Sequence, residues 1–419
     1  MLRRVLIGVA LGVVLLAGAG VGYVLEKRHE SRNIEGSSTV EFVTTREHTT
    51  TAAKAHSAQK IVWPTFGYDA ARTKAPGVFA LRPPYRVAWT WREGSLLEFP
   101  PVVAYGRAYI ASIRGGLFAL DVRTGKVKWR YRTERCSAAS AAVDGRTVYH
   151  VFMNPKPCDP QSGRQSVTGT VVALDARSGK VRWERTIGAS ESSPAIVHGL
   201  VYVGDWRGTI YALDARTGHT RWRFETDGEV KAGVAVSGRR LYVGSYDGHL
   251  YALDALTGRL LWRSSAQQRL GGLGAFYATP AVAYGRVYVA NTDGKVYSYG
   301  ATSGRIRWSY STGGYAYSSP AVWRNRVYAG SHDRHLYCFD AATGRVLWSF
   351  RANGWVPGAP TLIDGLVYFS TATGRTYALD ARSGTLRWFW RDGQYTPVAA
   401  DNRRLYLVGY SKLYAMVPK

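Results

Sequence analysis

The chain has 419 residues, 46% of them hydrophobic, so it is long enough to bury a large core. Its formal net charge of +26 favours anionic partners such as acidic polymers or lipid headgroups. It has no run of five Lys or Arg residues and no nucleic-acid motif, which argues against specific nucleic-acid binding. Its three cysteines lack metal-ligand spacing, so we expect no zinc, iron–sulfur or covalent haem site, and no other metal site.

The first residues differ in character from the rest. Residues 1–4 are a short basic segment, and Val5–Val24 carries no charge over 20 residues, enough for a transmembrane signal anchor. A cleaved signal peptide is the alternative. No cysteine follows this segment to accept a lipid, which argues against a lipoprotein. Residues 25–62, rich in Ser and Thr, predict a disordered linker. We therefore expect a single-pass membrane protein with its bulk, residues 63–419, outside the cytoplasm.

A phrase of the form Leu-Asp-Ala-Arg-Thr/Ser-Gly-x-x-x-Trp recurs along residues 63–419, at intervals of roughly 40 residues. Such a period indicates one supersecondary unit stacked many times, with each Trp packed between neighbouring sheets. The repeated tryptophans are Trp89, Trp129, Trp183, Trp222, Trp262, Trp308, Trp348 and Trp388.

The Asp of this phrase is expected to be structural rather than catalytic. Its carboxylate can accept backbone N–H groups two residues on, and the following Gly supplies a positive φ. The repeated carboxylates are Asp121, Asp175, Asp214, Asp254, Asp340 and Asp380. One degenerate repeat has Gly300 in place of Asp, which a turn tolerates and a catalytic site would not.

Each repeat contains four short β-rich runs separated by Gly turns, as in an antiparallel meander. Seven complete meanders lie between Pro100 and Trp390, and three further strands follow without a Trp-bearing fourth. The segment Arg86–Trp91 can supply that missing strand. The sequence therefore predicts an all-β protein: an eight-bladed β-propeller of four-stranded antiparallel blades, closed by N- and C-terminal strands, after an N-terminal transmembrane helix.

These residues, with the leading segment WPTFGYDAART (Trp63–Thr73), resemble the pyrroloquinoline-quinone (PQQ)-type repeat family over Trp63 to Lys419. Enzymatic members imply bound PQQ, Ca²⁺, an Asp base and usually two adjacent cysteines. This chain has no adjacent cysteines, is much shorter, and offers no positions for those catalytic residues, so we expect no cofactor. Closer in size is the accessory lipoprotein of the bacterial outer-membrane assembly machine, a non-enzymatic member. The resemblance implies a binding or scaffold module for a protein, peptide or anionic polymer; a PQQ-dependent dehydrogenase is the alternative.

Fourth-to-first strand loops and second-to-third strand turns share one face of such a propeller, here called the loop face. Its irregular loops place mixed charge and aromatic side chains around the channel mouth, which suits a ligand or peptide site. The alternative is a solvated rim with packed aromatics. The candidate binding residues are Glu98, Glu191, Lys231, Tyr277, Tyr317, Trp355 and Tyr395.

The cysteines and the arginines give two further predictions about the two faces of the propeller. A Cys136–Cys158 disulfide would close an insertion on the loop face, whereas Cys338 is expected to be a buried thiol. Arginines at strand turns gather on the opposite face, here called the basic face, where the linker is expected to emerge and where anionic lipid or wall polymer could bind. They are Arg107, Arg123, Arg146, Arg177, Arg216, Arg239, Arg286, Arg326, Arg345, Arg382 and Arg403.

Overall fold

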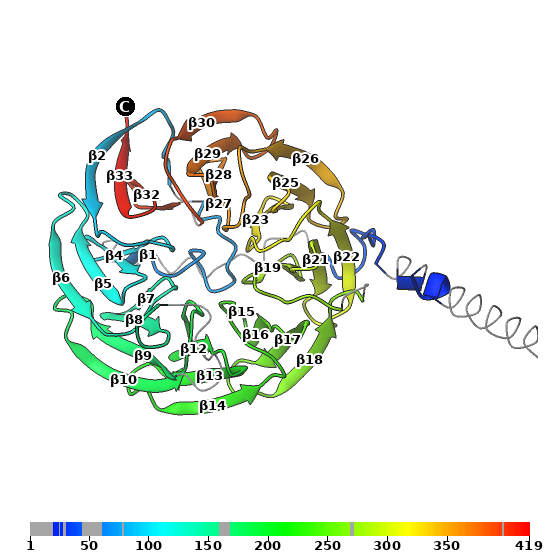
Figure 1. Ribbon diagram of the computed structural model, residues 1–419, viewed down its shortest axis with the longest axis horizontal. Coiled ribbons are helices and arrows are strands. Elements are labelled where there is room, and N and C mark those ends of the chain that lie inside the picture. Colours follow the sequence, from blue (N-terminus) through cyan, green and yellow to red (C-terminus); the bar gives the residue numbers. More distant parts are fainter. Residues whose placement is uncertain are drawn as a thin grey trace, which may run out of the picture.

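The computed structural model describes residues 20–24, 26–27, 31–43, 61–77, 79–158, 168–268, 272–395 and 398–419. Within these ranges the strands form eight antiparallel sheets placed around a ring (Figure 1). The predicted all-β, eight-bladed propeller is therefore confirmed. No helix among the described residues is long and apolar enough to cross a membrane, and residues 5–19 of the predicted span fall outside the described ranges.

The blades are numbered here from the first complete meander. Blade 1 contains β3 (Val102–Ala104), β4 (Arg107–Ser112), β5 (Gly116–Asp121) and β6 (Val127–Arg132), with β1 (Ile61–Trp63) beside β3; blade 2 contains β7 (Ala142–Asp144), β8 (Thr147–Phe152), β9 (Thr168–Asp175) and β10 (Val181–Gly188). Blade 3 contains β11 (Ala195–Val197), β12 (Leu200–Gly204), β13 (Thr209–Asp214) and β14 (Thr220–Glu225); blade 4 contains β15 (Ala235–Ser237), β16 (Arg240–Gly244), β17 (His249–Asp254) and β18 (Leu260–Ser265). Blade 5 contains β19 (Ala281–Ala283), β20 (Arg286–Ala290), β21 (Lys295–Gly300) and β22 (Ile306–Ser311); blade 6 contains β23 (Ala321–Trp323), β24 (Arg326–Gly330), β25 (His335–Asp340) and β26 (Val346–Arg351). Blade 7 contains β27 (Thr361–Ile363), β28 (Leu366–Thr371), β29 (Arg375–Asp380) and β30 (Leu386–Trp390); blade 8 contains β31 (Val398–Ala400), β32 (Leu405–Val408), β33 (Lys412–Pro418) and β2 (Tyr85–Arg92).

The ring is closed by strands from both ends of the repeat region. Strand β2 pairs antiparallel with β33, from Tyr85 opposite Pro418 to Arg92 opposite Lys412. The predicted pairing of Arg86–Trp91 with the C-terminal strands is thus confirmed. Closure matters because an open end would expose a strand edge along the side of the last blade.

Neighbouring blades are joined by a repeated aromatic contact. In blade 3, Trp222 Nε1 and the Tyr202 hydroxyl both donate hydrogen bonds to the carbonyl oxygen of Ala255 in the corner of blade 4, each at 2.9 Å. The corner residue Gly258 lies beneath the indole, so closely that a Cβ there would be 2.7 Å from the ring. The same Tyr and Trp donors converge on Ala176, Ala215, Ala301 and Ala341.

The seam between blades 7 and 8 is built differently, because β33 and β2 come from opposite ends of the chain and share no corner. Here Trp388 of blade 7 packs edge-on against Tyr85, with ring centroids 5.3 Å apart. The hydroxyl groups of Tyr85 and Tyr368 are hydrogen-bonded at 2.7 Å. On the other side of blade 8, Trp89 Nε1 donates to the carbonyl oxygen of Val122 in blade 1 at 2.9 Å.

The corner carboxylates act locally on their own turns. Asp214 Oδ1 accepts the backbone N–H groups of Arg216 at 3.1 Å and Thr217 at 2.9 Å. The same pair of backbone hydrogen bonds occurs at Asp121, Asp175, Asp254, Asp340 and Asp380. Each carboxylate therefore shapes a turn instead of facing a shared site.

The leading segment of the propeller domain crosses the centre of the ring (Figure 1). Its carbonyl groups accept N–H groups from the inner strands: Pro64 from Val143, Ala70 from Val236, Ala71 from Val282, Thr73 from Val322 and Lys74 from Leu362. These bonds connect blades 2, 4, 5, 6 and 7 through one short stretch of chain.

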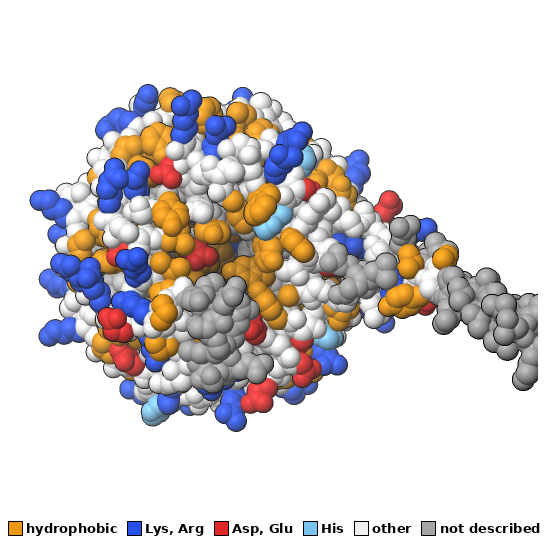
Figure 2. Space-filling view, in the orientation of Figure 1, with side chains coloured by type: hydrophobic (Ala, Val, Ile, Leu, Met, Phe, Trp, Pro, Cys, Tyr) orange, Lys and Arg blue, Asp and Glu red, His pale blue; other side chains and the backbone are white. Residues whose placement is uncertain are grey.

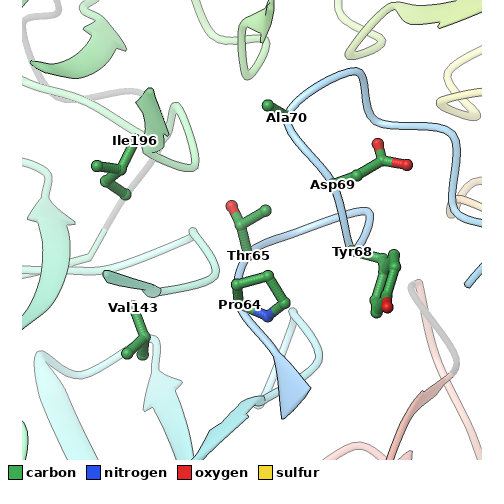
Figure 3. Close-up of a pocket in the computed structure, with 7 residues that line it drawn as sticks. All are labelled: Pro64, Thr65, Tyr68, Asp69, Ala70, Val143 and Ile196. Atoms are coloured by element: carbon green, nitrogen blue, oxygen red, sulfur yellow. The ribbon is translucent and has the colours of Figure 1, made fainter. Parts of the chain in front are cut away.

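Two cations of this segment are buried in the channel. The Arg72 guanidinium donates to backbone carbonyls that include Val234 at 2.9 Å, and the Lys74 ammonium donates to Pro320 at 2.9 Å. Burial, and then the charge of Arg72, lower the pKa of Lys74 to about 7. Beside the segment, Val143 and Ile196 line a pocket of about 90 Å³ (Figure 3).

The sequence prediction of a disordered linker over residues 25–62 is wrong for residues 31–43. They lie against blade 5, at the outer edge next to β22 (Figure 1). Ile34 forms an antiparallel bridge with Ser309, and the Val43 N–H donates to Tyr284 O at 3.1 Å. The segment holds its place mainly through backbone and polar side-chain contacts, which hydrophobic periodicity does not reveal.

The aromatic contact between blades can be tested with a pair of glycine substitutions. Gly344 and Gly365 have the same φ of +76°, so Ala at either position incurs a similar backbone cost, about 1 kcal/mol. A Cβ at Gly344 would lie 2.7 Å from the Trp308 ring, whereas nothing lies within 4 Å at Gly365. We expect Gly344→Ala to lower the free energy of unfolding by about 1–3 kcal/mol more than Gly365→Ala. Urea unfolding measures both, and equal losses would contradict the packing role.

Candidate functional site

The seven predicted binding residues each lie shortly before the inner strand of a blade. Five of them precede that strand by four positions, whereas Trp355 precedes it by six and Tyr395 by three. The loops that carry them run from the outer strand of one blade to the inner strand of the next. On the face shown in Figure 2, hydrophobic side chains gather around the central hollow with acidic ones among them, while Lys and Arg lie mostly towards the rim.

An ion cluster joins two of the predicted residues. Lys231 Nζ lies 3.1 Å from Glu229 Oε2 and 3.6 Å from Glu191 Oε1. The same ammonium is 4.8 Å from the ring centroids of both Trp206 and Tyr246, and Trp206 Nε1 donates to Glu191 Oε1 at 3.0 Å. The side chain of Lys231 is only 9% exposed, so this cation is held by two carboxylates and two aromatic faces.

The acidic groups of the mouth interact with one another. Burial, and then the charge of Glu191, raise the pKa of Glu98 to about 7. Burial also raises the pKa of Glu191, and the charge of Lys231 opposes that shift. Negative charge on Glu191 and burial raise the pKa of Tyr277, while burial and Glu98 raise that of Tyr395. The structure thus places Glu98 and Tyr395 within electrostatic reach of the cluster.

A row of rings continues from the ion cluster along the mouth. Ring centroids are 6.3 Å apart for Tyr246–Tyr277, 5.4 Å for Tyr277–Tyr317 and 4.9 Å for Tyr317–His332. The row ends with Trp355, whose ring stacks on His332 at 5.0 Å and 8°. The structure therefore brings Glu191, Lys231, Tyr277, Tyr317 and Trp355 into one connected set.

Two rings at the end of this row face solvent. Trp355 and Tyr315 are each 55% exposed. The Tyr315 ring lies 6.1 Å from His332, and burial lowers the pKa of His332, which favours the neutral imidazole in the stack. We name Tyr315, Tyr317, His332 and Trp355 the aromatic shelf.

Sequence reasoning missed several members of this site. Trp206, Tyr246 and His332 sit at the same position of three second-to-third strand turns, GDWRG, GSYDG and GSHDR. The sequence places these turns on the loop face, but the predicted binding residues include none from them. The aromatic or imidazole group at the centre of each turn was the available signal.

A disulfide lies beside the ion cluster. Cys136 and Cys158, the pair favoured by the sequence, are bonded with Cα atoms 5.5 Å apart, and Cys338 is a buried free thiol. Cys136 packs with Met153 and Trp206, so the bond fixes the base of the insertion next to the Trp206 ring. Residues 159–167 of that insertion lie outside the described ranges.

Most of the arginines assigned to the basic face are exposed, but Arg286 is fully buried. Arg146 and Arg216 line a groove of about 260 Å³ between blades 2 and 3 on this face. Val43 of the linker lies beside Tyr284 at the basic-face end of blade 5, and residues 31–34 run beside Ser309 and Ser311 towards the loop-face end of β22. Residues 44–60, which join the linker to the propeller, lie outside the described ranges.

A quinone with Ca²⁺ would need several oxygen ligands converging on one cation. Among the described residues no three His, Cys, Asp or Glu side chains are grouped to hold a metal ion. At the mouth, the ammonium of Lys231 lies between Glu191 and Glu229, where such a cation would compete with it. The single disulfide joins cysteines 22 residues apart instead of adjacent ones. This donor set does not fit a quinone–calcium centre.

Comparison with known proteins gives one family. The family model described as "Outer membrane protein assembly factor BamB" matches residues 39–205, 206–321 and 316–417. BamB of Yersinia pestis is 28% identical over 108 residues, which covers 26% of this chain and 26% of that protein. The 1-butanol dehydrogenase (cytochrome c) of Thauera butanivorans is 30% identical over 151 residues, 33% of this chain and 20% of the enzyme. These alignments span about a quarter or less of the curated relatives.

Solved structures share the fold. BamB from Moraxella catarrhalis superposes with a TM-score of 0.64 and 21% identity, covering 80% of this chain and 100% of that one. The quinohemoprotein alcohol dehydrogenase from Comamonas testosteroni gives a TM-score of 0.71 and 17% identity, covering 87% and 82%. At such identities the likeness extends to the propeller and not to a shared activity.

The raised pKa of Glu98 predicts a pH-dependent effect of its removal. With a folded pKa of about 7 and an unfolded value of about 4.3, the stability gained by protonating Glu98 is complete below pH 4.3 and is lost as the pH rises through 7. We expect Glu98→Gln to raise the free energy of unfolding by about 2 kcal/mol at pH 8 and to leave it unchanged at pH 4. Urea unfolding at both values measures this. Glu225→Gln, on the exposed side of β14, is the control, and an equal effect of Glu98→Gln at both pH values would refute the assignment.

Proposed function

We propose, from the premise that this chain belongs to the family of the outer membrane protein assembly factor BamB, that its propeller is a scaffold that binds a protein or peptide partner on the loop face. The observation that carries the proposal is the aromatic shelf, a pair of exposed rings supported from below by packed ones. Large rings held in place by neighbours lose little conformational freedom on binding, which makes them strong anchors at interfaces.

The charge of the mouth suggests which segments would suit this surface. Glu98 and Glu191 lie beside the row of rings, and the only cation of the ion cluster among the described residues, Lys231, is already paired with carboxylates. Electrostatic complementarity therefore favours a segment that combines a hydrophobic or aromatic residue with a basic one.

A PQQ-dependent dehydrogenase is the alternative, because several curated relatives are dehydrogenases. The donor set at the mouth does not support it, so no catalytic step is assigned to these residues. Adding PQQ and Ca²⁺ with an alcohol and a redox dye separates the two functions. Dye reduction by the loaded protein would favour the enzyme.

The basic face supports a secondary proposal, the binding of an anionic polymer. The supporting observation is the groove with Arg146 and Arg216 among exposed arginines of neighbouring turns. Contacts of this kind are screened by salt. We expect binding to polyphosphate to weaken several-fold between 50 and 300 mM NaCl, and Arg146→Ser/Arg216→Ser to reduce it at low salt. Affinity that is insensitive to both changes would refute this proposal.

The peptide-binding proposal predicts a strong effect of one shelf residue. Peptides selected for binding to the full chain from a displayed library should lose about 30-fold in affinity for the Trp355→Ala variant, as expected for a central anchor. Fluorescence anisotropy measures the affinities. Phe389→Ala is the matched control, because Phe389 is an exposed ring, 42% accessible, on the outer strand of blade 7. Selected peptides that bind Trp355→Ala as tightly as the unaltered protein would overturn the proposal.

A further inference from the structure

Blade 5 lacks the carboxylate that the other complete repeats carry in their corner. In blade 3, Asp214 Oδ1 accepts the hydroxyl of Thr217 at 2.9 Å, and Oδ2 pairs with Arg221 at 2.8 Å. These partners follow the Asp by three and seven positions. In blade 5 the same positions are Ser303 and Arg307, but the residue at the Asp position is Gly300.

The carboxylate of Glu41, which is distant in the chain, binds the side chains that correspond to those bound by the corner Asp in blade 3. Glu41 Oε2 accepts a hydrogen bond from the Ser303 hydroxyl at 2.7 Å and from Arg307 Nε at 2.8 Å. Ser303 and Glu41 are 262 residues apart in the chain. A Cβ built on Gly300 would lie 1.8 Å from Glu41 Oε2, so this carboxylate occupies the space that an Asp side chain would begin to fill.

The backbone around Glu41 is shaped to receive a buried cation. The guanidinium of Arg286 donates to the carbonyl oxygens of Glu41 at 2.6 Å, of Ser37 at 3.1 Å and of Val40. Arg286 is fully buried, whereas its counterpart in blade 4, Arg240, is exposed. Without residues 37–41, this charge would lose most of its acceptors.

The segment is also closely fitted along its length. Glu41 has a φ of +45°. A residue with a side chain adopts such a φ at an energetic cost, so the contacts around Glu41 must offset that cost. The Gly36 N–H donates to Thr343 O at 2.9 Å, and a Cβ on Gly36 would lie 2.5 Å from Ala342 O. The Phe42 ring packs on Tyr284 with centroids 5.5 Å apart.

We propose that blade 5 is a docking site for residues 31–43 of its own chain, and that Glu41 supplies the corner carboxylate which the fifth repeat has lost at Gly300. Docking carries the chain from the basic-face end of blade 5, at Val43 beside Tyr284, to the loop-face end of β22, at Asn33 beside Ser311. It thereby fixes where the upstream chain leaves the propeller, and so the orientation of the loop face relative to whatever holds that chain. The proposal does not depend on the partner of the aromatic shelf.

A double-mutant cycle on the full chain tests whether the Glu41 carboxylate takes the place of the corner Asp that is missing at Gly300. Glu41→Gln removes the negative charge and should accelerate hydrogen exchange of the Gly36 and Val43 amides by about tenfold or more, because their bonds to the propeller open more often. Glu35→Gln, an exposed carboxylate of the same segment, is the control and should leave exchange unchanged.

Gly300→Asp completes the cycle. It restores the carboxylate to the repeat, as in the other corners, so it should displace Glu41 and accelerate exchange of the segment while the propeller stays folded. In this background Glu41→Gln should have no further effect, because the two carboxylates compete for one position. Unchanged exchange in Glu41→Gln, or effects of the two substitutions that simply add, would overturn the proposal. Glu41→Gln lies outside the propeller repeats, so its result stands even if Gly300→Asp fails to fold.

Discussion

The fold depends on a backbone carbonyl shared between blades. In the corner of a blade, one carbonyl oxygen accepts both an indole N–H and a tyrosine hydroxyl from the preceding blade, as Ala255 does from Trp222 and Tyr202. Two donors and two large rings thus meet one point of the next sheet, while the corner glycine makes room for the indole. Because this contact recurs at most of the seams, it holds neighbouring sheets in a similar relation around the ring. At Ala381 only the Tyr328 hydroxyl donates, since Trp348 Nε1 has no hydrogen-bond partner among the described residues.

This contact lies in the strands and corners, so the loops on the other side are free to vary. The mouth of the channel shows the result. The aromatic shelf and the ion cluster come from different blades, yet their rings and charges meet because the blades are held at fixed angles. Within the ring, the leading segment ties the inner strands together and fills the channel with chain. A rigid ring with variable loops on one face is suited to presenting a surface to a partner.

The repeat could be read from the sequence because its residues act on near neighbours. The corner Asp, where it is present, accepts N–H groups two and three residues on, and the Trp of blades 1 to 6 meets the corner of the next repeat, so both residues recur at a regular spacing. Closure by Arg86–Trp91 followed from counting strands. At the candidate site, most of the residues predicted before the inner strands do lie together, but the prediction does not include His332 and Trp206, which lie in second-to-third strand turns.

The sequence by itself determined the repeat unit, the number of blades and the closure of the ring, since these rest on contacts that recur at a regular spacing. What only the tertiary structure decided were the contacts made once. Arg72 and Lys74 lie in the channel because their partners are carbonyl groups of several blades, and a carbonyl has no sequence signature. Glu41 completes the corner of blade 5 from 262 residues away, and nothing in a segment rich in Ser and Thr marks one carboxylate as the partner of a missing one. Such pairings are set by the closed ring, which brings distant backbone and side-chain groups within bonding distance.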